Sequence, residues 1–110
     1  ADAATVRELT PDIAGIAAVD PHGVIVTAAG DGSYDFVSRV FAPNAGIPED
    51  SVTGSAHCQL AVFWSQRIGR TTLSGFQASA RGGEVGVRVD GDRVVLSGNA
   101  VTVLTGSLLR

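Results

Sequence analysis

Residues 46–56 have the side-chain types and spacing best suited to chemistry. Two adjacent carboxylates, Glu49 and Asp50, precede a turn of small residues that opens a helix. The N–H groups in the first turn of a helix lack an intrahelical acceptor and lie at the positive end of its dipole, so those of Gly54 and Ser55 could bind a ligand carboxylate. Asp50 would then face the bound group at a distance suited to proton transfer. This arrangement would form one half of a proton-moving site.

A simpler interpretation of the same residues is that Asp50 and Thr53 only cap the helix. Short polar side chains at a helix start accept hydrogen bonds from the free N–H groups of the first turn. Caps are far commoner than ligand sites, so spacing alone favours the cap.

The other reactive side chains nearby form no recognisable catalytic or metal-binding set. Successive helical residues point about 100° apart, so His57 and Cys58 cannot share a metal ion, and we expect Cys58 to be a small buried residue. Ser55 and His57 diverge for a similar reason, and no G-x-S-x-G elbow surrounds the serine. We expect Trp64 to belong to the core.

A second polar segment contains Arg81, Gly82 and Gly83. The glycine pair lacks both the spacing and the following helix of a dinucleotide-binding loop, so it predicts a turn. Arg81 could bind an anion or simply cover the sheet.

Composition excludes several classes of function. The chain has 110 residues, 45% of them hydrophobic, which is enough for one domain with a core. All eight basic residues are arginines, so a Schiff-base lysine and a P-loop lysine are excluded. A net charge of −3 argues against a nucleic-acid partner. No apolar run approaches a membrane span and no signal peptide is visible, so we expect a cytoplasmic protein with no membrane partner.

Local patterns in the first half predict one short helix and two strands. Thr10 as a cap, with Pro11 and Asp12 after it, predicts a helix over residues 11–18. Runs rich in β-branched and aromatic residues predict strands over residues 24–28 and 34–41. Residues 42–50 contain two prolines and a glycine, and we expect them to form a loop.

The second half is predicted to contain the longest helix and several strands. Apolar residues recur every three or four positions from Thr53 to Gly69, which is typical of a helix with one buried face. Strands separated by glycine-rich turns are predicted over residues 72–77, 84–89, 93–97 and 100–104. The fold class is therefore α+β, with a mostly antiparallel sheet, one central helix and a short N-terminal helix.

Four segments in the same order resemble the PhzF-like family of phenazine biosynthesis, which has the diaminopimelate epimerase fold. Residues 46–56 are similar to its motif G-x-x-E-D-P-x-T-G-S-A, with Ser51 where the family usually has proline. The flanking strand at residues 35–43, the segment 77–83 and the closing run 91–106 also resemble the family. The resemblance covers nearly the whole chain.

This resemblance implies that residues 1–110 form a single domain, the C-terminal lobe of a two-lobed protein whose active site lies between the lobes. It implies that Asp50 is the acid/base and that Thr53, Gly54 and Ser55 bind substrate. The main catalytic glutamate of the family lies in the first lobe, and Glu49 matches only the neighbour of the acid. The family works without metal or organic cofactor, so we expect none.

Two functions follow as hypotheses. In the first, the chain is the C-terminal lobe of an isomerase or epimerase that moves protons on a small carboxylate-bearing metabolite. In the second, it is a non-catalytic lobe that associates with itself or with a separate first lobe, because a lobe without its mate should expose an apolar face.

Overall fold

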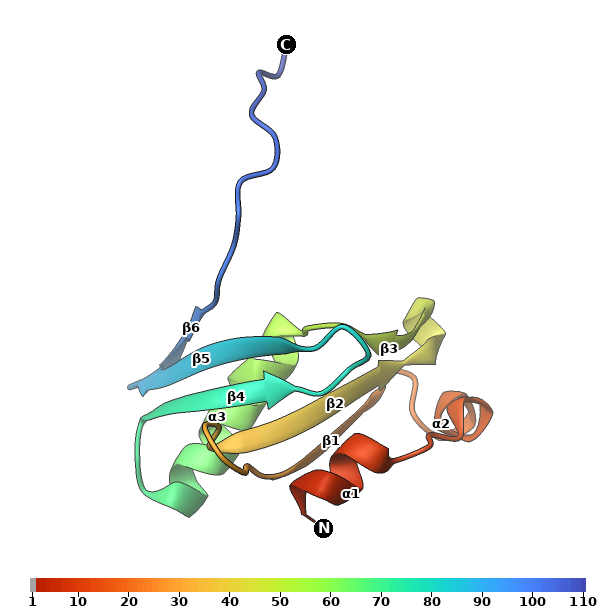
Figure 1. Cartoon of the computed structure of the whole chain (residues 1–110). Helices are drawn as coiled ribbons and strands as arrows, with labels where there is room; N and C mark the ends of the chain where they lie inside the picture. Colours follow the sequence, from red (N-terminus) through yellow and green to blue (C-terminus); the bar gives the residue numbers. More distant parts are fainter. Residues whose placement is uncertain (1) are drawn as a thin grey trace.

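The computed structural model describes residues 2–110. These residues form one mixed sheet with helices on both faces (Figure 1). The strands of these residues are β1 (Val24–Ala29), β2 (Phe36–Ala42), β3 (Ile47–Asp50), β4 (Thr72–Gln77), β5 (Gly83–Asp90) and β6 (Arg93–Ser97). They follow the order β1-β2-β4-β5-β6, and β3 pairs with β2. Every pair is antiparallel except β2 with β4. The predicted α+β class with a mostly antiparallel sheet is confirmed.

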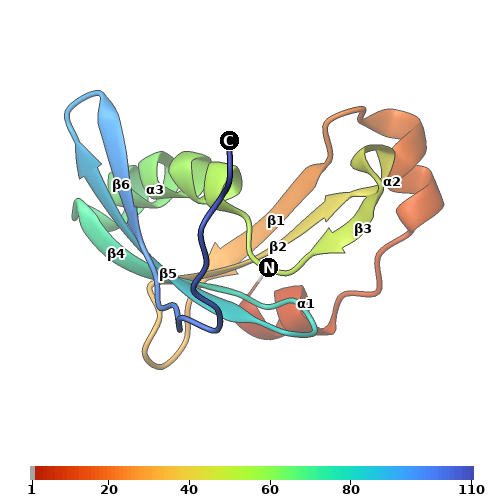
Figure 2. The ribbon, with the colours of Figure 1, turned by 90° about the horizontal axis from the view of Figure 1, so that it is seen from above.

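Strand β2 is buried on both faces, because helices cover the sheet from both sides (Figure 2). Phe36 packs with residues of α3 (Gly54–Ile68), whereas Val37 packs with residues of α1 (Ala3–Glu8). Side chains alternate between the two faces of a strand, so neighbouring residues of β2 enter different cores. The strand can therefore position groups on both sides of the sheet.

Helix α3 confirms the predicted central helix. Its buried residues include Leu60 and Ala61, which pack against β4 and β5. Trp64 stacks on Phe36 with ring centroids 6.2 Å apart, and its Nε1–H donates to Thr27 Oγ1 at 3.0 Å. The helix ends at Gly69, whose φ of 79° lies in the left-handed region that glycine adopts without strain. No helix within residues 2–110 is long and apolar enough to cross a membrane.

The loop predicted over residues 42–50 is wrong, because this segment contains a 3₁₀ turn, η1 (Pro43–Ala45), and strand β3. Strand β3 pairs with β2 through Val40 and Asp50. It pairs with no other described strand, and proline is tolerated at such an edge because one side of the strand needs no donor. Pro48 therefore does not prevent the pairing.

The N-terminal part differs from the prediction in two ways. Helix α2 spans Ile13–Val19, and its cap is Asp12, whose Oδ1 accepts from the Gly15 N–H at 3.0 Å; the expected cap, Thr10, lies before it. Helix α1 was not expected from the sequence. It is held by tertiary contacts, because Val6 is buried in the core that contains Val37.

The strand predicted over residues 100–104 is also wrong. Residues 98–110, called the tail below, have no regular structure and are exposed, and they extend away from the sheet beyond β6 (Figure 1). A strand exists only where another strand satisfies its N–H and C=O groups. None of the described strands pairs with the tail.

Candidate functional site

The candidate site forms where strands β3 and β4 meet along one edge of β2. Strand β1 pairs with β2 along its other edge, so β3 and β4 share the remaining edge end to end. Asp50 ends β3 opposite Val40, and Gln77 ends β4 opposite Ser38. This arrangement brings the predicted acid next to a residue far from it in the chain.

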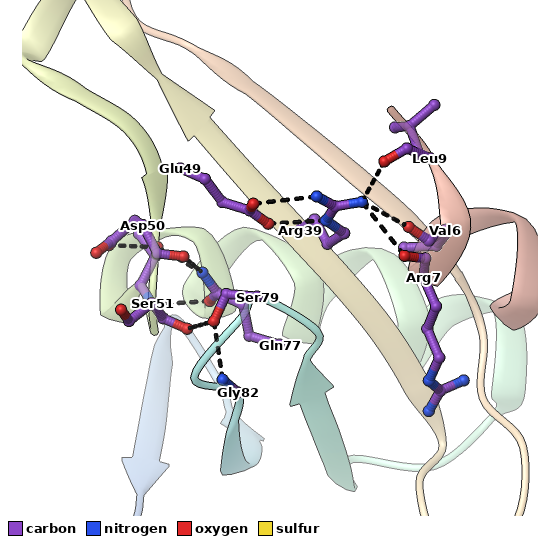
Figure 3. A network of polar contacts seen from close by, with 11 residues as sticks. Val6, Arg7, Leu9, Arg39, Glu49, Asp50, Ser51, Gln77, Ser79 and Gly82 are labelled. Carbon is purple, nitrogen blue, oxygen red and sulfur yellow. Dashed lines mark hydrogen bonds and ion pairs between the residues drawn. The ribbon is translucent and has the colours of Figure 1, made fainter. Parts of the chain in front are cut away.

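A buried amide holds the turn between Asp50 and the helix (Figure 3). Gln77 is fully buried; its Oε1 accepts from the Thr53 N–H at 2.7 Å, and its Nε2 donates to the Asp50 carbonyl at 2.9 Å. Because an N–H can only donate and a carbonyl can only accept, this orientation of the amide is the one that satisfies both groups. Both ends of the turn are thereby fixed by one side chain.

The same amide determines which oxygen of the Asp50 carboxylate accepts a hydrogen bond. Gln77 Nε2 also donates to Thr53 Oγ1 at 3.0 Å, and that hydroxyl donates its single hydrogen to Asp50 Oδ2 at 2.6 Å. No described residue donates to Asp50 Oδ1. The carboxylate is therefore oriented through one oxygen while the other is available.

The capping interpretation of these side chains is wrong. Thr53 occupies the N-cap position, but its side chain makes no hydrogen bond to the helix, and Asp50 binds the Thr53 hydroxyl instead. No side chain among residues 2–110 accepts from the N–H groups of Gly54 and Ser55, and both residues are exposed. The start of α3 consequently has donors available to a ligand.

Gly54 is not required by the packing of the described residues. A Cβ at this position would meet Leu96 Cδ1 at 3.7 Å, which is ordinary van der Waals contact, and the φ of Gly54 is not positive. The fold therefore leaves space above the helix start that a side chain could occupy.

A pocket of about 420 Å³ lies beside the helix start. Asp50, Thr53 and Ser55 line it together, whereas Gly54 does not. The rest of its wall comes from α3, from the strands β1, β2 and β3, and from the turn before β1: Asp20, His22, Gly23, Val24, Ile25, Val40, Ala42, Ile47, Ala56 and Gln59. The pocket thus combines polar groups at the helix start with an apolar wall.

The two adjacent carboxylates point to opposite faces of the sheet and have different partners (Figure 3). Glu49 accepts from Arg39 Nε at 2.7 Å and from Nη2 at 3.0 Å, and this hydrogen bonding raises the pKa of Arg39. Arg39 Nη1 also donates to three carbonyls at the end of α1, those of Val6, Arg7 and Leu9. Glu49 is thus part of a contact that ties α1 to β3.

His57 contributes to the turn from inside the core. It is fully buried, and its Nδ1 lies 2.7 Å from the Thr53 carbonyl, which requires the hydrogen on Nδ1. Burial lowers the pKa of His57, opposed by the hydrogen bond to Thr53, and so favours the neutral ring. Its Nε2 has no hydrogen-bond partner among residues 2–110. Cys58 is a half-buried free thiol.

No hydrogen bond joins Ser55 to His57, and within residues 2–110 no group of three His, Cys, Asp or Glu side chains gathers as a metal site.

Gln77 and Ser79 are the site residues that the sequence did not single out. Ser79 Oγ donates to the Ser51 carbonyl at 2.8 Å and accepts from the Gly82 N–H at 3.0 Å. This contact uses the Ser51 backbone, so it does not depend on the side chain that replaces the usual proline. A signal for Gln77 exists in hindsight, because it follows the inward-facing Leu73 and Gly75 at a spacing of two.

Comparisons with known proteins agree with this architecture. The family model of "Phenazine biosynthesis-like protein" matches residues 1–106. An uncharacterized isomerase of Pseudomonas aeruginosa is 50% identical over 103 residues, which are 94% of this chain and 39% of that protein.

Two solved structures are also similar. A PhzF family protein of Enterococcus faecalis has a TM-score of 0.85 at 48% identity, over 89% of this chain and 38% of that one. A PhzC/PhzF protein of Clostridium difficile has a TM-score of 0.85 at 38% identity, over 97% of this chain and 41% of that one. The chain thus spans about two fifths of the length of these relatives. It belongs to the family of phenazine biosynthesis-like proteins.

Proposed function

We propose that this chain is the C-terminal lobe of a two-lobed isomerase, in which Asp50 transfers protons and Thr53, Gly54 and Ser55 bind a substrate carboxylate. The observation that carries the proposal is the state of the Asp50 carboxylate. Oδ2 is held by the Thr53 hydroxyl, and Oδ1 is available beside the same pocket that Ser55 lines.

The start of α3 supplies the binding half of the proposed site. The N–H groups of Gly54 and Ser55 have no side-chain acceptor in the described part of the chain, and the helix dipole favours an anion at this end. The Ser55 hydroxyl adds a third donor in the same region. Because Gly54 carries no side chain, a carboxylate can approach the backbone closely. The apolar wall of the pocket suits the carbon skeleton of a small metabolite.

Asp50 supplies the proton-transfer half. Isomerisation or epimerisation removes a proton from one carbon and returns a proton to another carbon or to the other face, so no electrons are gained or lost. Asp50 Oδ1 would take or give that proton while Gln77 and Thr53 hold the carboxylate in place. The second acid/base, a glutamate, would come from a first lobe facing this pocket.

Turnover by a two-lobed protein that contains this lobe tests the catalytic role. We expect Asp50→Asn to lower kcat by about a hundredfold or more with substrate binding unchanged, because a positioned acid or base contributes that much. Asp92→Asn is the matched control, since Asp92 is exposed and lies in the turn between β5 and β6. Full turnover by Asp50→Asn would show that the assigned role is wrong.

Nuclear magnetic resonance on the chain itself tests the binding role. Titration with small carboxylic acids should shift the amide signals of Gly54 and Ser55, and Ser55→Ala should weaken the binding. Uniform small shifts over the whole chain, unchanged by Ser55→Ala, would argue against a carboxylate site at this helix.

A further inference from the structure

A buried histidine holds the peptide group that opens helix α3. The Thr53 carbonyl accepts two hydrogen bonds from His57, one from the ring Nδ1–H at 2.7 Å and one from the backbone N–H at 3.3 Å. The backbone bond is the ordinary first bond of a helix, and it is longer than the usual length of about 3.0 Å. The ring therefore supplies the shorter of the two contacts to this carbonyl.

The core fixes the ring of His57 in turn. The side chain is fully buried, and its ring centroid lies 5.9 Å from that of Phe36, which belongs to the core under α3. Nε2 has no partner among residues 2–110, so the bond to Thr53 is the one hydrogen bond that the ring makes with them. A ring that this chain already buries completely lies out of reach of any further part of a longer protein.

A second buried side chain holds the other peptide group of Thr53. Gln77 Oε1 accepts from the Thr53 N–H, which belongs to the Val52–Thr53 peptide group. The carbonyl that His57 holds belongs to the Thr53–Gly54 group. The two peptide groups on either side of Thr53 are thus anchored separately, one by β4 and one by α3.

Fixing the Thr53 carbonyl also fixes the N–H of Gly54. The peptide bond is planar and trans, so its carbonyl oxygen and its N–H point in opposite directions. The Thr53 oxygen points along the helix toward His57, and the Gly54 N–H therefore points out of the helix start. No group among residues 2–110 accepts from that N–H. It is one of the donors that the proposed function assigns to a substrate carboxylate.

We propose that His57 is a positioning residue for substrate binding: its Nδ1–H, acting through the Thr53–Gly54 peptide group, holds the Gly54 N–H in the direction of the substrate carboxylate. This inference rests on the proposed function, since it takes the carboxylate to bind at this helix start. His57 itself does not touch the substrate. A donor whose direction is already fixed loses less freedom when an anion binds, which raises the affinity.

Three substitutions separate the hydrogen bond from the packing. His57→Leu keeps an apolar side chain in the core and removes the donor. His57→Asn keeps a donor, because the amide nitrogen of asparagine is as far from its Cβ as Nδ1 is in histidine. Leu60→Val is the matched control, since it shortens a buried side chain of the same helix and removes no hydrogen bond.

Nuclear magnetic resonance on the chain itself measures the direction and mobility of the Gly54 N–H without a ligand. In the wild type, the ring nitrogen signals should show the hydrogen of His57 on Nδ1, and a hydrogen on Nε2 instead would overturn the proposal. The residual dipolar coupling of the Gly54 N–H should fall in His57→Leu and be kept in His57→Asn and Leu60→Val. An unchanged coupling in His57→Leu would also overturn it.

Titration with acetate measures the effect on binding. The dissociation constant should rise about tenfold in His57→Leu, and less than about threefold in His57→Asn and in Leu60→Val. Equal affinity of His57→Leu and the wild type, or equal losses in His57→Leu and Leu60→Val, would overturn the role of His57 alone. A wild-type chain whose Gly54 and Ser55 signals do not respond to acetate would overturn the proposed carboxylate site, and with it the role of His57 in binding.

Discussion

Replacing Gln77 by methionine is the sharpest test of how the Asp50 turn is held. Methionine has nearly the same length and volume as glutamine but neither donates nor accepts a strong hydrogen bond. The change removes three hydrogen bonds, those to the Thr53 N–H, the Asp50 carbonyl and the Thr53 hydroxyl. Each such bond contributes about 1 kcal/mol net, so we expect the free energy of unfolding to fall by about 3 kcal/mol.

A loss of this size is a large part of the roughly 5 to 15 kcal/mol that stabilises a domain. Urea unfolding followed by the fluorescence of Trp64, which packs against the core beside α3, measures it. We expect the midpoint to fall by about 1 to 2 M urea, and hydrogen exchange at the Thr53 amide to accelerate.

Gln66→Met is the control for the loss of an amide, since Gln66 is exposed and its side chain makes no hydrogen bond within residues 2–110. It should change the free energy of unfolding by less than about 0.5 kcal/mol. If Gln77→Met were as mild as Gln66→Met, and the Thr53 amide stayed protected, the buried amide would not be what holds the turn.

Two further predictions concern pH and the second carboxylate. Burial lowers the pKa of His57 in the folded chain, so the unfolded chain takes up the proton at a higher pH. The free energy of unfolding should therefore be highest above about pH 6.5, the ordinary pKa of histidine. It should decrease below that pH by up to about 1.4 kcal/mol per pH unit. Unfolding curves between pH 5 and 8 should lose this slope in His57→Gln and keep it in His22→Gln, and a slope retained in His57→Gln would contradict this assignment. Glu49→Gln should lower stability by about 1 to 3 kcal/mol, because Arg39 keeps its buried charge without a carboxylate. Asp90→Asn, which breaks an exposed ion pair with Arg88, should lower the free energy of unfolding by less than about 0.5 kcal/mol in the same urea assay. If both variants lost the same stability, the contact between Arg39 and Glu49 would be worth no more than an exposed ion pair.

The elements with strong local patterns could be predicted from the sequence. Helix α3 and the strands β1, β2, β4, β5 and β6 follow apolar periodicity that lies within each segment. Helix α1 has a local cap, in which Asp2 accepts from the Thr5 N–H, but its six residues are also held by a distant partner, and strand β3 depends on one entirely. Arg39 holds α1, and β2 makes β3 a strand despite Pro48. The tail shows the converse, a strand-like sequence that lacks a partner among residues 2–110.

Only those residues of the candidate site that lie close together in the sequence were predictable. The motif placed Asp50, Thr53 and Ser55 at one helix start, and all three line the same pocket. The alternation with Leu73 and Gly75 indicates that Gln77 faces inward, but the hydrogen bonds by which it supports the Asp50 turn were not predictable. Those bonds depend on β3 and β4 sharing one edge of β2, which no local pattern encodes.

The parallel pairing of β2 and β4 also affects the order in which the site can form during folding. A parallel pair needs a long crossover, and here the chain passes through β3 and the whole of α3 before β4 returns to β2. The bond from Gln77 to Asp50 spans 27 residues, so the turn is held only after that crossover has closed. During synthesis, Asp50 therefore leaves the ribosome well before the strand that orients it, and a partly folded chain has no oriented carboxylate.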